Sequence, residues 1–85
     1  MDKKISVRIK FFSGLDKDLK LENYNPAEGI RIVIPKGKRL KLALKAMGLK
    51  TFSDCAYFRS GERISPWSKL RDGDEVTCLK PSGGG

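Results

Sequence analysis

The residues best placed to do chemistry stand at the end of the sequence. Pro81 and Ser82 are followed by three glycines, an arrangement that places a terminal carboxylate on Gly85. Glycine has no Cβ and the most backbone freedom, so such a terminus is expected to project as a flexible tail and to fit a narrow channel. This composition suits a protein that delivers its own carboxylate into the active site of another. The alternative is an ordinary frayed end or linker, as Gly-rich termini commonly are.

Within the rest of the chain, the composition restricts the available chemistry. There is no histidine, which removes Ser-His and Cys-His nucleophile pairs and any zinc site that needs a histidine ligand. Cys55 and Cys78 do not form a CxxC motif and are expected to be free thiols that pack as small hydrophobic groups. We therefore expect neither an enzyme nor a metal site.

Length and hydropathy are typical of one small domain. The chain has 85 residues, of which 39% are hydrophobic, and this is enough for a single modest core. No apolar run approaches the roughly 20 residues of a membrane span, and the first residues lack the apolar region of a signal peptide. We expect a cytoplasmic protein without a membrane partner.

The charge is strongly positive and unevenly distributed. Net charge is +8, from 18 basic and 10 acidic residues, and the basic residues dominate the middle of the chain. Residues 29–53 contain seven basic residues and no acidic one. Such a block can bind nucleic acid, an acidic protein or nucleotide phosphate, although it is most often a solvated helix face.

Two strands are predicted in the first part of the chain. Residues 5–11 alternate between apolar and polar, which places Ile5, Val7, Ile9 and Phe11 on the core side. Phe12 then falls on the solvent side, where a large aromatic side chain is unexpected. Residues 30–34 form a second strand that is expected to pair antiparallel with the first, and the turn-rich segment 13–28 between them is expected to pack loosely.

A helix is predicted next, over residues 38–47. Apolar residues follow the spacing i, i+3, i+4 and i+7, which gives one buried stripe: Leu40, Ala43, Leu44 and Met47. Gly48 stands where a glycine would end the helix. The lysines lie on the opposite face, with Leu42 among them.

The last third of the chain is read as strands. Residues 55–59 and a short segment around 63–64 flank a turn at 60–62, and residues 75–80 form the final strand after a turn at 72–74. In the final strand, alternation places Val76 and Cys78 inward and Leu79 outward. The sum is an α+β domain with a mixed sheet of four to five strands and one main helix packed across it.

This sequence resembles the ubiquitin-like β-grasp superfamily, and within it the small sulfur carriers of molybdopterin and thiamine biosynthesis (MoaD/ThiS type). The resemblance rests on Ile9-Lys-Phe-Phe12, the Ser60-Gly-Glu62 turn, the DGDEV motif at 72–76 and the Gly-Gly end. It covers nearly the whole chain, but only the final third is specific. It implies a β-grasp domain over residues 1–80 and a flexible tail over residues 81–85.

The resemblance also implies a carrier function. In such carriers an E1-like enzyme adenylates the terminal carboxylate, which is then converted to a thiocarboxylate that donates sulfur. On this basis Gly85 carries the reacting group and Gly84 supplies its flexible approach. The carrier binds no cofactor itself, since the partner enzyme uses the ATP and magnesium. Further partners would be a sulfur donor and a synthase large subunit.

The same resemblance suggests an interface for the activating enzyme. Phe12 and Leu79 match apolar positions of the family's docking face on the outer side of the sheet. Arg63 falls where a further apolar contact is expected. Ser60 also departs from the family pattern, because asparagine is common in that turn.

Two alternative functions start from the same residues. An RNA-binding module of the TGS type would use the basic block, but residues 29–50 contain no aromatic residue for base stacking. We therefore do not expect nucleic acid as a partner. A ubiquitin-like protein modifier would begin with the same adenylation of Gly85, and the sequence hardly separates it from a sulfur carrier.

Overall fold

Alternating side chains place the first and last strands at the centre of one sheet. The computed structural model describes residues 3–50 and 52–80. In strand β1 (Lys4–Phe11), the four apolar side chains predicted to face the core are each no more than 6% exposed. β1 pairs antiparallel with β2 (Ile30–Pro35) and parallel with β5 (Glu75–Leu79). The predicted faces of β1 and the antiparallel pairing are confirmed.

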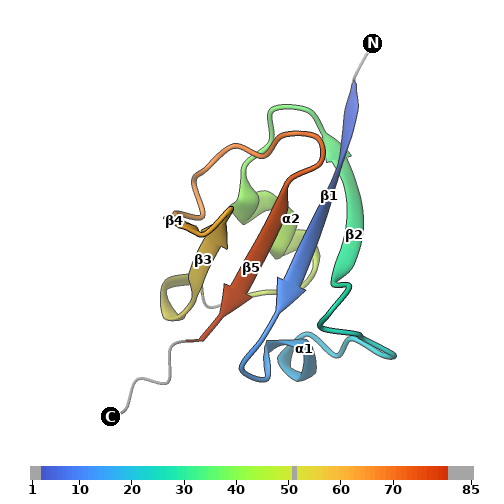
Figure 1. Ribbon diagram of the computed structural model, residues 1–85, viewed down its shortest axis with the longest axis vertical. Coiled ribbons are helices and arrows are strands. Elements are labelled where there is room, and N and C mark those ends of the chain that lie inside the picture. The colour runs from blue at the N-terminus through green and yellow to red at the C-terminus, as the bar shows by residue number, and fades with distance from the viewer. Residues whose placement is uncertain (1–2, 51, 81–85) are drawn as a thin grey trace.

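The sheet is mixed and has five strands, in the order β2-β1-β5-β3-β4 (Figure 1). β3 (Ala56–Arg59) pairs antiparallel with both β5 and β4 (Glu62–Ile64). The two residues that join β3 to β4 both have positive φ, 53° at Ser60 and 80° at Gly61, as in the tight turns that suit the twist of a hairpin. The predicted α+β class and the turn at this position are confirmed.

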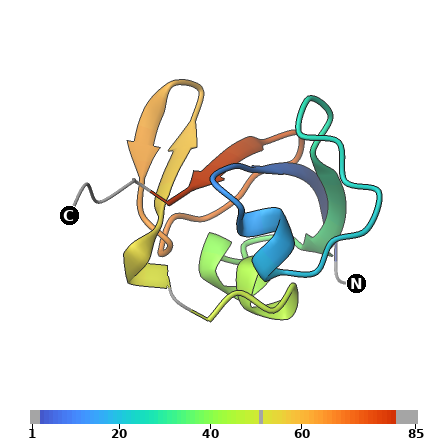
Figure 2. The same ribbon diagram turned by 90° about the horizontal axis from the view of Figure 1, so that it is seen from below.

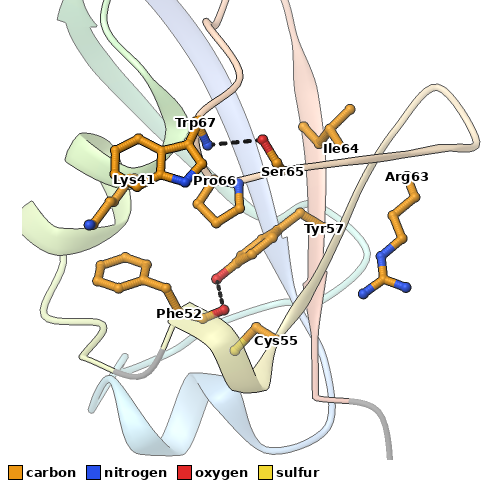
Figure 3. Close-up of a pocket in the computed structure, with 9 residues that line it drawn as sticks. All are labelled: Lys41, Phe52, Cys55, Tyr57, Arg63, Ile64, Ser65, Pro66 and Trp67. Atoms are coloured by element: carbon orange, nitrogen blue, oxygen red, sulfur yellow. Dashed lines mark hydrogen bonds between the residues drawn. The ribbon is translucent and has the colours of Figure 1, made fainter.

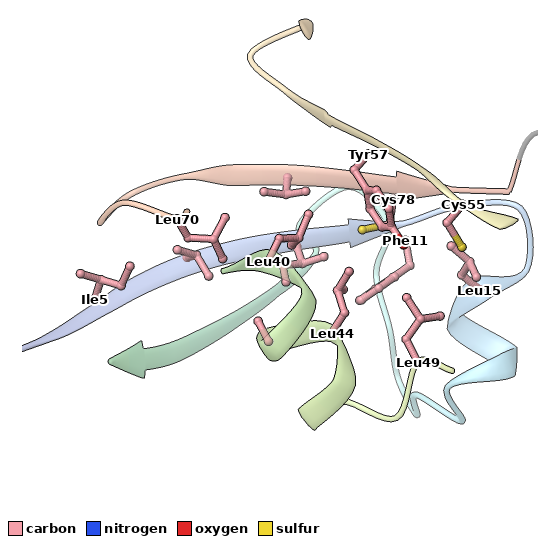
Figure 4. Packing of buried hydrophobic residues seen from close by; sticks show 14 residues of the cluster. Ile5, Phe11, Leu15, Leu40, Leu44, Leu49, Cys55, Tyr57, Leu70 and Cys78 are labelled. Carbon is pink, nitrogen blue, oxygen red and sulfur yellow. The ribbon is translucent and has the colours of Figure 1, made fainter. Parts of the chain in front are cut away.

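The main helix, α2 (Leu40–Ala46), packs across one side of the sheet (Figure 2). Leu40, Ala43 and Leu44 are buried, and they meet the inward side chains of β1 and β5 in the core (Figure 4). The predicted stripe is confirmed at these three positions, whereas Met47 follows the last helical residue and is only partly buried against the core. Gly48 comes next, with a φ of 102°.

The helix begins later than residue 38, where the sequence placed it. Arg39 is extended, with φ −90° and ψ 155°, and forms an isolated antiparallel bridge with Lys69. The carbonyl of Lys38 accepts the N–H of Leu70 at 3.1 Å. Residues 38 and 39 are thus held in an extended conformation by pairing with the chain before β5, a long-range contact that local helix propensity does not contain.

The segment between β1 and β2 packs more tightly than predicted. It contains a short helix, α1 (Leu15–Asp18), and Leu15 is fully buried. The hydroxyl of Tyr24 accepts the backbone N–H of Phe11 and donates to the carbonyl of the same residue. These contacts fix the segment against the end of β1.

The DGDEV motif holds β5 against β1. The carboxylate of Asp72 accepts the N–H of Ser6 at 2.8 Å, and the N–H of Gly73 donates to the Ser6 carbonyl at 2.8 Å. The carboxylate of Asp74 accepts the N–H of Arg71 at 2.9 Å and pairs with the guanidinium of Arg59 at 3.1 Å. These contacts give Asp72 and Asp74 a structural role that accounts for their presence in the motif.

Two further expectations concern the boundary of the tail and the membrane. The proposed tail, residues 81–85, lies outside the described residues, so the boundary at residue 80 stays a prediction. Over the residues that are described, no helix is long and apolar enough to cross a membrane.

Candidate functional site

The outer face of the sheet, on the side away from α2, carries the predicted docking residues. Phe11 is the register partner of Cys78 in the parallel β1–β5 pair, and the N–H of Phe12 donates to the Cys78 carbonyl at 2.9 Å. This bond places the backbone of Phe12 next to the end of β5, where Leu79 is the last residue. The Phe12 side chain is 40% exposed, and that of Leu79 is half-buried. The structure thus brings together two residues that are 67 positions apart in the sequence.

A second row of side chains crosses the same face. Lys10, Thr77, Phe58 and Arg63 are successive register partners on β1, β5, β3 and β4. Phe58 and Thr77 help to line a hollow of about 440 Å³. Arg63 is exposed at the end of this row, two strands away from Leu79, so it lies on the same sheet but not beside the Phe12–Leu79 pair.

Phe58 is a residue of this face that the sequence analysis did not single out. It is half-buried and stands between Thr77 and Arg63. Its signal was present in the strand alternation, because Tyr57 points inward and its neighbour must then point outward. We call the surface formed by Phe12, Leu79 and Phe58 the outer apolar face.

An ion pair borders this face. The ammonium of Lys10 lies 2.9 Å from the carboxylate of Glu75. The hydrogen bond from Lys10 and its positive charge lower the pKa of Glu75, with a smaller contribution from the charge of Arg8. The carboxylate of Glu75 therefore stays ionised at neutral pH, and its partner is the ammonium of Lys10 on the neighbouring strand.

Neither the cysteines nor the acidic residues form an obvious reactive centre. Burial raises the pKa of Cys78 to about 12, with a further contribution from Cys55, so the Cys78 thiol stays protonated and is a poor nucleophile at neutral pH. Burial also raises the pKa of Tyr57, whose hydroxyl donates to the Phe52 carbonyl at 3.0 Å. No cluster of three or more His, Cys, Asp or Glu that could hold a metal occurs in residues 3–50 and 52–80.

The reacting residues of the expected chemistry, Gly84 and Gly85, lie outside the described residues. The structure does locate the point from which they follow. β5 ends at Leu79, at the end of the sheet where Phe12 is exposed. Lys80, the last described residue before the glycines, therefore follows directly on the outer apolar face.

A second surface feature lies on the α2 side of the sheet and was not predicted. A pocket of about 390 Å³ opens between α2, the 3-10 turn η1 (Phe52–Asp54) and the β3–β4 hairpin with the turn that follows it (Figure 3). Lys41, Phe52 and Trp67 lie on one side of it, with the buried Tyr57 and the partly buried Ile64 on the other. We call this the Lys41–Trp67 pocket. No sequence spacing indicates it, because its residues come from separate segments.

The comparisons with known proteins address the fold. The sequence matches none of the protein-family profiles and none of the curated proteins with which it was compared. One similar solved structure is a Pyrococcus furiosus protein assigned as molybdopterin converting factor, subunit 1. It is 19% identical with a TM-score of 0.66, over 91% of this chain and 98% of that one. Another is SAMP1 from Haloferax volcanii, 18% identical with a TM-score of 0.69, over 94% of this chain and 99% of that one. At these identities the likeness establishes the fold, which is the predicted ubiquitin-like β-grasp.

Proposed function

We propose that this protein is a sulfur carrier that works through a terminal glycine carboxylate. An E1-like enzyme adenylates the carboxylate of Gly85, and a sulfur donor then converts the acyl-adenylate to a thiocarboxylate. The protein is a co-substrate in this scheme and not a catalyst. The proposal requires Gly85 to be the last residue of the mature protein.

The observation that carries the proposal is the position of the outer apolar face. The N–H of Phe12 donates to the carbonyl of Cys78, so Phe12 lies at the end of β5, whose last residue, Leu79, stands four positions before the first of the terminal glycines. An enzyme bound to this pair would have the terminal glycines within reach of an adjoining active site. Two apolar anchors in a polar surround suit a transient interface, in which a few residues supply most of the binding energy.

The chemistry divides between the two proteins. A carboxylate is a poor electrophile, so the partner enzyme activates it: a carboxylate oxygen of Gly85 attacks the α-phosphorus of ATP and pyrophosphate leaves. A sulfide equivalent then attacks the acyl carbon and AMP leaves. The partner supplies magnesium, positioning and charge stabilisation, whereas the carrier supplies the acyl group and a backbone without side chains at Gly84.

The fold comparison supports one client pathway over another. The similar Pyrococcus furiosus protein is described as a subunit of a molybdopterin converting factor, and the tail spacing and the Phe11-Phe12 pair favour the same assignment here. We therefore propose molybdopterin or the related tungsten cofactor as the client pathway, ahead of thiamine. A synthase large subunit would receive the thiocarboxylate in the cytoplasm.

Carrier-dependent pyrophosphate exchange tests the first step. The protein is incubated with labelled pyrophosphate, ATP and each E1-like enzyme of its own organism, and incorporation of label into ATP is measured. We expect exchange with one of these enzymes, and none after deletion of Gly84 and Gly85. Equal exchange by the deletion variant would contradict the proposal, because the carboxylate would then not be the group that reacts.

A further inference from the structure

The Lys41–Trp67 pocket has no role in the proposed carrier function. It lies on the α2 side of the sheet, whereas the outer apolar face lies on the other side (Figures 2 and 3). Its most unusual member is Trp67, the only tryptophan of the chain, whose side chain is 60% exposed.

The backbone around Trp67 is held firmly, so the exposure of this side chain does not follow from a loose loop. The N–H of Trp67 donates to the Ser65 hydroxyl at 3.2 Å, and its carbonyl accepts the guanidinium of Arg39 at 2.6 Å. The first turn of α2 has no side-chain cap; instead, the N–H groups of Leu40 and Lys41 donate to the carbonyls of Ser68 and Pro66, at 2.9 and 2.8 Å. These bonds fix the ring beside the helix and present it to solvent.

Aromatic and cationic groups meet at this place. The ammonium of Lys41 lies 4.4 Å from the centre of the Trp67 ring and 5.5 Å from that of Phe52. Arg63 borders the pocket from β4, but its register with Phe58 directs its side chain to the outer side of the sheet. Over the described residues there are two ion pairs, and neither of them uses Lys41 or Arg63. The ammonium of Lys41 is therefore available to an anionic ligand.

The sequence argument against nucleic acid considered only the residues of the basic segment. That argument rested on the absence of aromatic residues in the basic segment 29–50. Aromatic residues from outside this segment, Phe52 and Trp67, pack against Lys41 in the folded protein. Stacking surfaces and basic groups are thus interleaved in space, although they are separate in sequence.

We propose that the Lys41–Trp67 pocket binds single-stranded nucleic acid, with a base stacked on the aromatic groups and the backbone phosphates on the basic residues. Proteins that bind single strands combine a positive surface with aromatic stacking platforms in this way. The net charge of +8 and the acid-free basic segment that contains Lys41 match a ligand with repeating negative charge. An acidic polypeptide would match the charge but would offer no flat base for Trp67.

The test measures the anisotropy of a labelled short oligouridylate, at low salt and over a salt series. Unlabelled uridine monophosphate and polyglutamate serve as competitors, and quenching of Trp67 fluorescence is followed for the unaltered protein and for the two lysine variants. The variants are Trp67→Ala, Trp67→Phe and Lys41→Met. Lys36→Ala is the matched control, because Lys36 is exposed in the same basic segment but does not line the pocket.

We expect Trp67→Ala to weaken binding about tenfold, with much of the loss restored in Trp67→Phe, because stacking of one base makes a contribution of this size. Lys41→Met should weaken binding and lower the salt dependence, whereas Lys36→Ala should leave the Trp67 quenching intact. Because the bonds that position Trp67 are made by its backbone, the melting temperature of Trp67→Ala should be close to that of the unaltered protein.

Three results would overturn the proposal. The first is no binding of the oligonucleotide at low salt. The second is equal affinity of Trp67→Ala and Lys36→Ala, which would indicate general attraction to a basic surface. The third is competition by uridine monophosphate or polyglutamate as effective as that by the unlabelled oligonucleotide, which would identify a nucleotide pocket or a site for an acidic protein. The deletion of Gly84 and Gly85 should not change binding, so this test is independent of the carrier proposal.

Discussion

The outer apolar face and the Lys41–Trp67 pocket both expose aromatic side chains, but the chain builds them in different ways. The outer apolar face follows from strand alternation, since Phe58 and Leu79 stand at outward positions of β3 and β5, and Phe12 directly follows β1. The pocket instead joins α2, η1 and the turn after β4, which do not follow one another in sequence. The difference shows that one side of this small sheet is specified by local pattern and the other by long-range packing.

The two proposed activities are assigned to different sides of the sheet. α2 covers one face of the sheet and leaves the other uncovered (Figure 2). The outer apolar face lies on the uncovered side, whereas the pocket is lined in part by Lys41 of α2. A change on one surface should therefore leave the other intact, and the predictions below test that independence in order of decreasing effect.

The largest effect is expected from Phe12→Asp. A charge at an apolar anchor should weaken activation by the E1-like enzyme by about thirtyfold or more, the size expected for loss of an interface hot spot. Oligonucleotide binding should not change. The measurements are kcat/KM for pyrophosphate exchange and the anisotropy titration. Val33→Asp is the control, since Val33 is 61% exposed on the edge strand β2, away from Phe12. An unchanged activation rate in Phe12→Asp would remove this residue from the interface.

A smaller effect is expected from Asp74→Ala. This change removes the acceptor of the Arg71 N–H and the partner of Arg59, and it should lower the free energy of unfolding by about 1–2 kcal/mol. Urea unfolding measures the change, with Glu22→Ala as the control for loss of an exposed acidic side chain. If Asp74→Ala impaired activation while stability was retained, the DGDEV motif would belong to the docking surface and would not be mainly structural.

The contrast between the two surfaces also indicates what the sequence could predict. Alternation was sufficient for the faces of β1, and the spacing of Leu40 and Leu44 was sufficient for the buried stripe of α2. The pocket could not be predicted, because Trp67 reaches Lys41 only through backbone bonds between the turn at 65–68 and the first turn of the helix. The same contacts explain why the start of α2 was misplaced.

The hairpin that contributes to both surfaces provides the next test. Ser60 has a φ of 53°, which asparagine adopts more readily than serine. We expect Ser60→Asn to raise the free energy of unfolding by about 0.5 kcal/mol, since the left-handed conformation costs an ordinary residue roughly 1 kcal/mol. Both activities should be retained. A loss of stability in urea unfolding would show that the Ser60 side chain has a role that the turn geometry does not reveal.

The smallest effect is expected on the pH dependence of unfolding, through the Lys10–Glu75 ion pair at the border of the outer apolar face. The pKa of Glu75 is below its ordinary value of 4.5 because of Lys10, so the ion pair favours the folded state when the pH is above 4.5. That contribution is lost as the pH falls through the pKa of the folded protein, where the carboxylate becomes protonated. Unfolding of Glu75→Gln should therefore differ slightly from that of the unaltered protein near pH 7 and should converge with it in acid. A difference that grew on acidification would contradict this assignment.

The most direct test of the central claim is the intact mass of the protein after incubation with ATP, the activating enzyme and a sulfur donor. The carrier account predicts a gain equal to replacement of one oxygen by one sulfur, located at Gly85 and absent after deletion of Gly84 and Gly85. If adenylation occurs but no sulfur is gained, and Gly85 instead appears in isopeptide bonds to lysines, the protein would be a modifier. If neither product forms with any E1-like enzyme of the organism, the carrier account would be wrong.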